Sequence, residues 1–124
     1  MLKIFGIKNF DSPHIGVFYC KDIESCKDVV KGYKLSLGVI LNNENNVLGY
    51  IRDNSEIVFF KENVQNSYNF CYVLENKGVF VNLETLDRVH RYLEENEVDF
   101  GFIIEDGNLK YIIEEGALVD RKYF

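Results

Sequence analysis

Apolar and polar side chains alternate along most of the chain in short runs, a period that predicts β-strands. The runs are rich in β-branched and aromatic residues, and they end at clusters of Asn, Asp, Gly or Pro, which favour turns. The pattern predicts nine strands, over residues 2–7, 14–20, 35–41, 47–52, 57–61, 68–75, 78–81, 98–105 and 109–114. The first two strands are expected to pair.

Two segments have the spacing of amphipathic helices. The first should follow Asp22 as its N-cap and end near Gly32, with one apolar side formed by Ile23, Cys26, Val29 and Val30. The second is expected from Leu83 to Glu95, with Asn82 as its N-cap and an apolar stripe of Leu86, Val89 and Leu93. Glu84 with Arg88 and Asp87 with Arg91 would then stand four residues apart in the favourable order.

The predicted elements indicate an α+β fold. Most of the connecting turns are too short for parallel crossovers, so we expect a mainly antiparallel sheet of short strands and hairpins with two helices. A length of 124 residues suits a single domain over residues 1–124. The sequence shows no internal repeat beyond a general succession of hairpins.

The last predicted hairpin has a strong turn signal. Asp106-Gly107 is typical of a two-residue type I′ turn, which would pair residues 104 with 109, 102 with 111, 100 with 113 and 99 with 114. One face would then be apolar, from Phe100 to Ile113. On the other face Asp99 would stand opposite Glu114, a like-charge pair that destabilises a sheet.

Composition indicates a compact globular chain. Apolar residues make up 47% of the sequence, with ten Phe, eight Tyr and a single Pro. The longest apolar runs are a few residues, far below the roughly 20 that a membrane helix needs. The first 13 residues lack the apolar core of a signal peptide. We therefore expect a cytoplasmic protein that does not enter a membrane.

Few residues are available for catalysis or metal binding. The three cysteines, Cys20, Cys26 and Cys71, fit neither zinc-ligand spacing nor a disulfide framework, so we expect reduced, buried thiols and no cofactor. Glycine-rich phosphate loops and the hydrolase G-x-S-x-G motif are absent. The alternatives are a reactive Cys26, or a Cys20 or Cys71 nucleophile working with His90.

The net charge of −6 is carried by the second half of the chain. Residues 1–62 hold eight acidic and eight basic side chains, whereas residues 63–124 hold 12 and six. An acidic surface repels phosphate backbones, so nucleic acid is not expected as a ligand and a cationic protein is.

The acidic residues are densest between residues 90 and 115, where eight carboxylates face only Arg91 and Lys110 among the basic side chains. Glu94 and Glu95 lie in the last turn of the predicted helix, where the helix dipole disfavours negative charge. A surface arranged against its own fold is often functional. A merely solvated acidic face is the simpler alternative, and a metal shared by His90 and Glu94 is another.

From these observations we predict a small, non-catalytic, acidic protein-binding module. Its most concrete form is an immunity or antitoxin-like inhibitor that covers the basic active site of a cationic toxin such as a nuclease. The predicted partner-binding residues are Tyr92, as an aromatic anchor, and Glu94, Glu95, Glu97, Asp99 and Glu114. The alternatives are a small enzyme or ligand-binding domain that uses Cys or His, and a structural homo-oligomer subunit.

Overall fold

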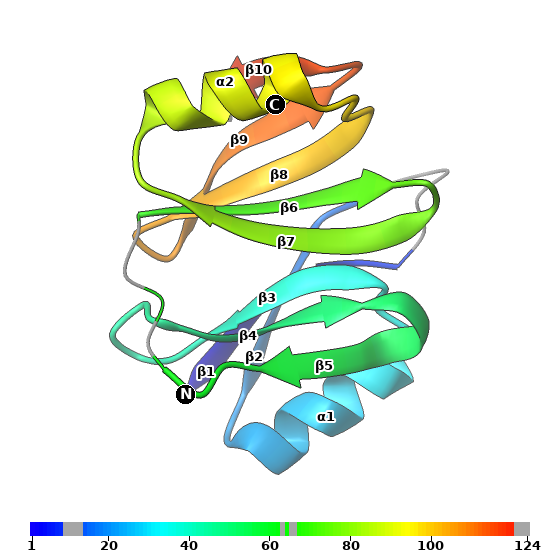
Figure 1. The fold of residues 1–124 in the computed structure, drawn as a ribbon. Helices are drawn as coiled ribbons and strands as arrows, with labels where there is room; N and C mark the ends of the chain where they lie inside the picture. The colour runs from blue at the N-terminus through cyan, green and yellow to red at the C-terminus, as the bar shows by residue number, and fades with distance from the viewer. Residues whose placement is uncertain (9–13, 63, 65–66, 121–124) are drawn as a thin grey trace. The chain divides into compact units, whose positions relative to one another are not determined.

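The computed structural model describes residues 1–8, 14–62, 64 and 67–120, and the chain divides into two compact units, Met1–Val64 and Gln65–Phe124. Each unit is one five-stranded antiparallel sheet with one helix, as Figure 1 shows. The predicted α+β class, with short antiparallel strands and two helices, is confirmed.

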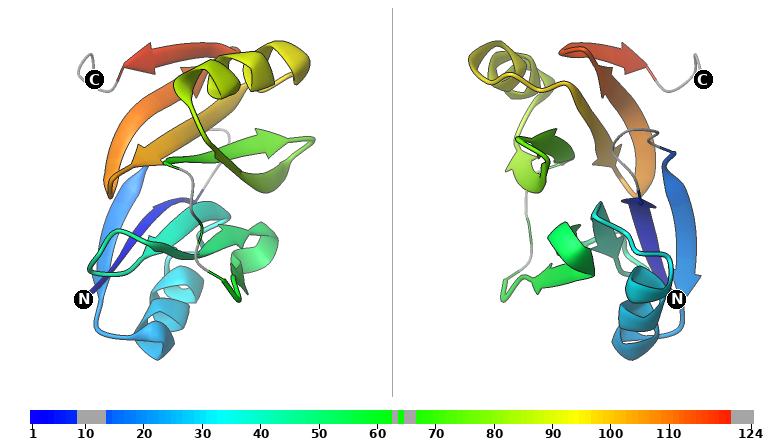
Figure 2. Two further views of the ribbon diagram at one scale, coloured as in Figure 1. Left: turned by 60° about the vertical axis from the view of Figure 1, so that its left-hand side comes forward. Right: turned by 90° about the vertical axis from the view of Figure 1, so that its right-hand side faces the viewer.

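The first unit contains five strands and helix α1. In chain order these are β1 (Leu2–Ile7), β2 (Gly16–Cys20), α1 (Ile23–Gly32), β3 (Leu37–Leu41), β4 (Val47–Arg52), the short 3-10 turn η1 (Asp53–Ser55) and β5 (Glu56–Phe59). The strands lie in the order β2-β1-β3-β4-β5, so β1 and β2 pair as predicted. Helix α1 packs on one face of this sheet, where Cys26 and Val30 join Ile4, Ile40 and Ile51 in a buried cluster (Figure 2).

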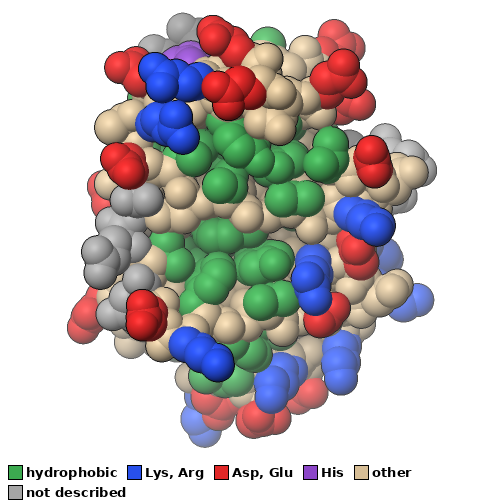
Figure 3. All heavy atoms as spheres, viewed as in Figure 1, with side chains coloured by type: hydrophobic (Ala, Val, Ile, Leu, Met, Phe, Trp, Pro, Cys, Tyr) green, Lys and Arg blue, Asp and Glu red, His purple; other side chains and the backbone are tan. Residues whose placement is uncertain are grey.

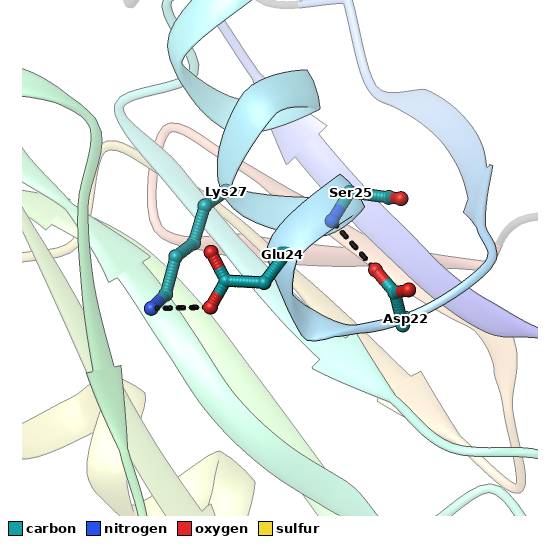
Figure 4. Close-up of polar contacts among 4 residues, drawn as sticks. All are labelled: Asp22, Glu24, Ser25 and Lys27. Atoms are coloured by element: carbon teal, nitrogen blue, oxygen red, sulfur yellow. Dashed lines mark hydrogen bonds and ion pairs between the residues drawn. The ribbon is translucent and has the colours of Figure 1, made fainter.

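Helix α1 begins where the sequence predicts. The Asp22 carboxylate accepts a hydrogen bond of 2.8 Å from the backbone N–H of Ser25 (Figure 4). In the same part of the helix, the Lys27 Nζ lies 3.2 Å from the Glu24 Oε1. The cap satisfies a backbone donor that the helix itself leaves free. Because the bonded carboxylate is favoured in its charged form, the pKa of Asp22 is lowered.

The second unit is built from β6 (Tyr68–Leu74), β7 (Lys77–Leu83), α2 (Leu86–Glu95), β8 (Phe100–Glu105), β9 (Asn108–Glu114) and β10 (Ala117–Asp120). Its strand order is β10-β9-β8-β6-β7. Helix α2 lies over one face of the sheet, where Val89 packs in a buried cluster with Phe70, Tyr72, Ile103 and Ile113 (Figure 2).

The two units share one topology. Read in chain order, each is strand, strand, helix and three strands, and in each the first strand lies between the second and the third. Both helices have ten residues, and the N-cap Thr85 follows the N-cap Asp22 by 63 positions. The third and fourth strands carry an irregularity in register at the same place, between Ile40 and Leu41 and between Ile103 and Ile104. The chain is therefore a structural repeat.

The repeat is hidden in the sequence because the two units share pattern rather than identity. When residues 14–41 are set against residues 77–104 without a gap, only Gly38 with Gly101 and Ile40 with Ile103 are identical. Burial is nevertheless matched, since Cys26 and Val89 are both fully buried. Apolar side chains of different size can fill equivalent core positions, so patterning survives where identity does not.

The second helix starts three residues later than predicted. Asn82 belongs to strand β7, where its side-chain amide donates to the Asn69 side-chain oxygen at 2.7 Å, and it does not cap the helix. Thr85 caps instead, because its hydroxyl accepts from the backbone N–H of Arg88 at 3.2 Å. Glu84 therefore precedes the helix, and its predicted helical pairing with Arg88 is wrong.

The β6–β7 turn lies at other residues than predicted, and the β9–β10 turn was not predicted. The β6–β7 turn is Glu75-Asn76, both with positive φ, whereas the predicted strands 68–75 and 78–81 left residues 76 and 77 to connect them. A tenth strand, β10, follows the turn at Glu115-Gly116, whose φ values of 51° and 77° match those of the predicted Asp106-Gly107 turn. Glu-Gly is a weaker turn signal than Asp-Gly because Glu does not favour the left-handed conformation.

Candidate acidic binding site

Four of the five predicted acidic residues line one groove of the second unit. The groove has a volume of about 450 Å³ and lies where α2 leads into β8, beside the β9–β10 turn. We call its five carboxylates the acidic groove: Glu94, Glu95, Glu97, Asp99 and Glu115. Figure 3 shows a group of acidic side chains at this end of α2, and further acidic side chains beside the basic ones toward its other end.

All five carboxylates are exposed, and none has an internal counter-ion within ion-pair distance among the residues that the structure describes. The ion pairs found in that part of the chain, Lys27 with Glu24 and Arg52 with Glu56, belong to the first unit. No basic residue lies in the last turn of α2, although Lys31 occupies that place in α1. The negative charge of the groove is therefore left to solvent and to whatever binds there.

The β8–β9 hairpin has a different register from the predicted one. The hairpin starts as expected, with Ile104 opposite Leu109, but the irregularity beside Ile103 shifts the rest by one residue, so that Phe100 lies opposite Glu114. The predicted Asp99–Glu114 pair is wrong. Instead the backbone N–H of Glu115 donates to the Asp99 carbonyl at 2.7 Å, which brings Glu115 to the groove.

Glu114 lies next to the groove rather than in it. Its side chain is exposed on β9, and it follows Ile113, which is buried in the core of the unit. Glu115 takes the place that the sequence assigned to Glu114. The sequence signal that could have found it is the Glu115-Gly116 dipeptide, which marks a turn at the end of the ribbon.

Tyr92, the predicted aromatic anchor, turns toward the core of its unit. Its hydroxyl shares a hydrogen bond with that of Tyr72, and its ring lies edge-on to Phe70, with centroids 5.8 Å apart. Tyr72 is only 3% exposed, so burial, and after it the bond to Tyr92, raises its pKa. The half-buried Tyr92 supports the helix that carries Glu94 and Glu95, and the acidic groove is defined without it.

The structural repeat offers an internal comparison for the groove. Counting 63 positions back from Glu94, Glu95, Glu97 and Asp99 gives, in that order, Lys31, Gly32, Lys34 and Ser36. The first unit therefore has no carboxylate at these positions, although its helix ends differently: Tyr33 is helical and Lys34 has a φ of 54°, whereas Asn96 is extended. The shared strand order does not require carboxylates here.

The thiol and imidazole alternative finds little geometry to support it. All three cysteines are buried, and burial raises the pKa of both Cys71 and Cys26, the latter to about 12. A raised pKa suppresses the thiolate that would act as nucleophile. His14 and His90 are exposed. In the described ranges, no three His, Cys, Asp or Glu side chains gather closely enough to hold a metal ion. His90 and Glu94 therefore have no third ligand of these types there.

Comparisons with protein-family models, with curated proteins and with solved structures find no match to this chain. Among the described residues, neither helix has the length and apolar character that crossing a membrane requires.

Proposed function

We propose that this protein is a non-catalytic binding module whose acidic groove receives the cationic surface of another protein. The observation that carries the proposal is the convergence of five exposed carboxylates on one groove, with no lysine or arginine of the described chain paired to them. Like charges gathered in this way repel one another, and a docked cation relieves that repulsion.

The comparison between the two units argues against a purely structural reason for the charge. In the first unit, lysines occupy the counterpart positions 31 and 34 and suit the helix dipole, although Lys34 has a left-handed backbone conformation with a φ of 54°. Glu94 and Glu97 forgo that favourable arrangement. A local rule broken in one copy of a repeat and kept in the other indicates a demand from outside the fold.

The chemistry of the groove suits lysine and arginine side chains. A carboxylate accepts two parallel hydrogen bonds from a guanidinium, and a groove of about 450 Å³ has room for several such side chains. A protein that covers the basic active site of a toxin, such as a nuclease, needs no catalytic group or cofactor of its own, only carboxylates placed against the cations that would hold phosphate. We therefore propose an immunity or antitoxin-like inhibitor acting in the cytoplasm.

Charge reversal tests the proposal. The variant Glu94→Lys, Glu95→Lys and Glu97→Lys should fold, because all three side chains are exposed. Its matched control is Asp28→Lys, Glu44→Lys and Glu62→Lys, three exposed residues of the first unit that give the same change in net charge. Parent, variant and control are each used as bait in extracts of the source cells, and captured proteins are identified by mass spectrometry.

The proposal expects parent and control to capture the same basic protein and the groove variant to lose it. With that partner purified, the association rate at low salt should fall roughly 10- to 1,000-fold in the groove variant, and the difference should shrink as added salt screens the charges. Equal association by all three proteins would place the binding surface elsewhere. A partner lost by both triple variants would mean that only total charge matters, which also contradicts the proposal.

A further inference from the structure

Strand β2 forms one edge of the first sheet. Among the described residues it pairs with β1 alone, so the backbone N–H and C=O groups on its outer side have no strand to bind. Folded proteins usually protect such an edge with a charged residue, a proline or a bulge. Gly16–Cys20 contains no charged residue and no proline, and it pairs with β1 in one unbroken register. An edge of this kind is a template for a further strand.

Apolar side chains are exposed on both faces of this edge. Val17 and Tyr19 are 46% and 61% exposed on one face of β2. On the other face, Phe18 packs toward the helix, and the ring of Tyr33, which follows α1 and is 56% exposed, lies 4.6 Å from it between centroids. Three of the seven large apolar side chains that are exposed in the described residues thus border one strand. Clustered apolar exposure marks an interaction surface.

The second unit does not repeat this feature. Its strand β7 is the counterpart of β2 and also lies at a sheet edge. Counting 63 positions on from Tyr19 gives Asn82, whose amide binds the Asn69 side chain on the neighbouring strand. The first residue of β7 is Lys77, a charge that disfavours pairing with a further strand. The shared topology therefore does not require an exposed apolar edge, and the first unit has one.

We propose that two copies of this chain associate through β2, antiparallel and about a twofold axis, so that their two first sheets join into one. Phe18 is the centre of the five-residue strand. Alignment of Phe18 with Phe18 of the second copy therefore pairs every residue from Gly16 to Cys20. Val17 then lies directly opposite Tyr19 of the second copy, and a β-branched side chain opposite an aromatic one stabilises an antiparallel pair. The same surface serves both copies, as a twofold interface requires.

The charges beside the strand are complementary in this alignment. Lys21 falls opposite Ile15 of the second copy, and the Asp22 carboxylate falls opposite the imidazole of His14. Like charges therefore do not meet across the twofold axis. A shift of two residues in either direction would leave two residues of each five-residue strand without a strand partner. Backbone pairing and charge thus favour the same register.

The first test measures the mass of the full chain in solution by sedimentation equilibrium. With rising concentration, the parent should reach twice the chain mass of 14.5 kDa. Tyr19→Lys places a charge on the exposed edge and should remain a single chain at the concentrations where the parent is a dimer. The matched control is Phe59→Lys on β5, the opposite edge strand of the same sheet, which should dimerise as the parent does.

Several masses would overturn the proposal. These are a parent that stays a single chain at all concentrations, a parent whose mass keeps rising beyond two chains, and a dimer that both variants lose or both keep.

A second measurement tests the alignment without a charged substitution. Val17→Cys and Tyr19→Cys are prepared separately, and both sites are exposed whereas the three native cysteines are buried. Directly opposed residues of antiparallel strands have the separation that a disulfide needs. With oxidised glutathione as the electron acceptor, an equal mixture of the two variants should form a dimer linked between positions 17 and 19, and each variant alone should form far less. A mixture that yields no such link, or no more than the single variants, would overturn the proposal. The acidic groove is unchanged in all these variants, so the outcome is separate from that of the proposed function.

Discussion

The glycine shared by both units gives a prediction about the architecture itself. Gly38 lies in β3 directly opposite Gly6 of β1, and its counterpart Gly101 lies in β8 opposite Tyr72 of β6. A methyl group on Gly38 would lie 2.2 Å from the Phe5 carbonyl oxygen and 2.9 Å from the Gly6 Cα, both backbone atoms. Ordinary contacts begin at about 3.4 Å, so the strands would have to separate.

The size of the effect follows from those distances. Overpacking of a well-filled core costs roughly 1 to 3 kcal/mol, and a clash of more than an ångström with backbone belongs at the upper end. We therefore expect Gly38→Ala to lower the free energy of unfolding by about 3 kcal/mol. Gly101→Ala, whose nearest contact is the Cys71 carbonyl oxygen at 2.7 Å, should cost somewhat less, about 2 kcal/mol.

Gly32, the last residue of α1, provides the control. A methyl group there would meet nothing within 4 Å, so Gly32→Ala should raise the free energy of unfolding by about 0.5 to 1 kcal/mol through the lower flexibility of alanine in the unfolded chain. Urea unfolding followed by circular dichroism measures all three variants. If Gly38→Ala were as stable as Gly32→Ala, the close approach of β1 and β3 would be refuted.

Two further predictions concern single hydrogen bonds. Asp22→Ala should lower the melting temperature at neutral pH. Because the folded-state pKa of Asp22 lies below its ordinary value of 3.8, the difference in melting temperature from the parent should be full above pH 3.8 and vanish as the pH falls through the lower folded-state pKa. A difference that does not change with pH would contradict the cap. Tyr92→Phe should lower the free energy of unfolding by about 1 to 3 kcal/mol, because it leaves the buried Tyr72 hydroxyl without this partner. Adding Tyr72→Phe should recover part of the loss, and strictly additive losses in urea unfolding would show that the two hydroxyls are not coupled.

The acidic groove illustrates which parts of a site a sequence can reveal. The density of carboxylates between residues 90 and 115 and their conflict with the helix dipole are properties of the chain order, so Glu94, Glu95, Glu97 and Asp99 were identified in advance. Glu115 was not, because it reaches the groove through a turn and a backbone hydrogen bond to Asp99 that depend on the β8–β9 register. Because the register of that hairpin shifts by one residue, Glu115 lies at the groove and Glu114 does not.

The sequence by itself determined the local elements. Alternation of apolar and polar residues fixed β1 and β4 to the residue, and a carboxylate before an amphipathic run fixed the start of α1, because these features depend on neighbours within a few positions. Only the tertiary structure decided that Asn82 pairs across strands instead of capping a helix, and that the strands of the described residues form two sheets of one topology. Strand partners are chosen by packing among distant residues, and core positions accept many apolar side chains, so the repeat could not be inferred from chain order.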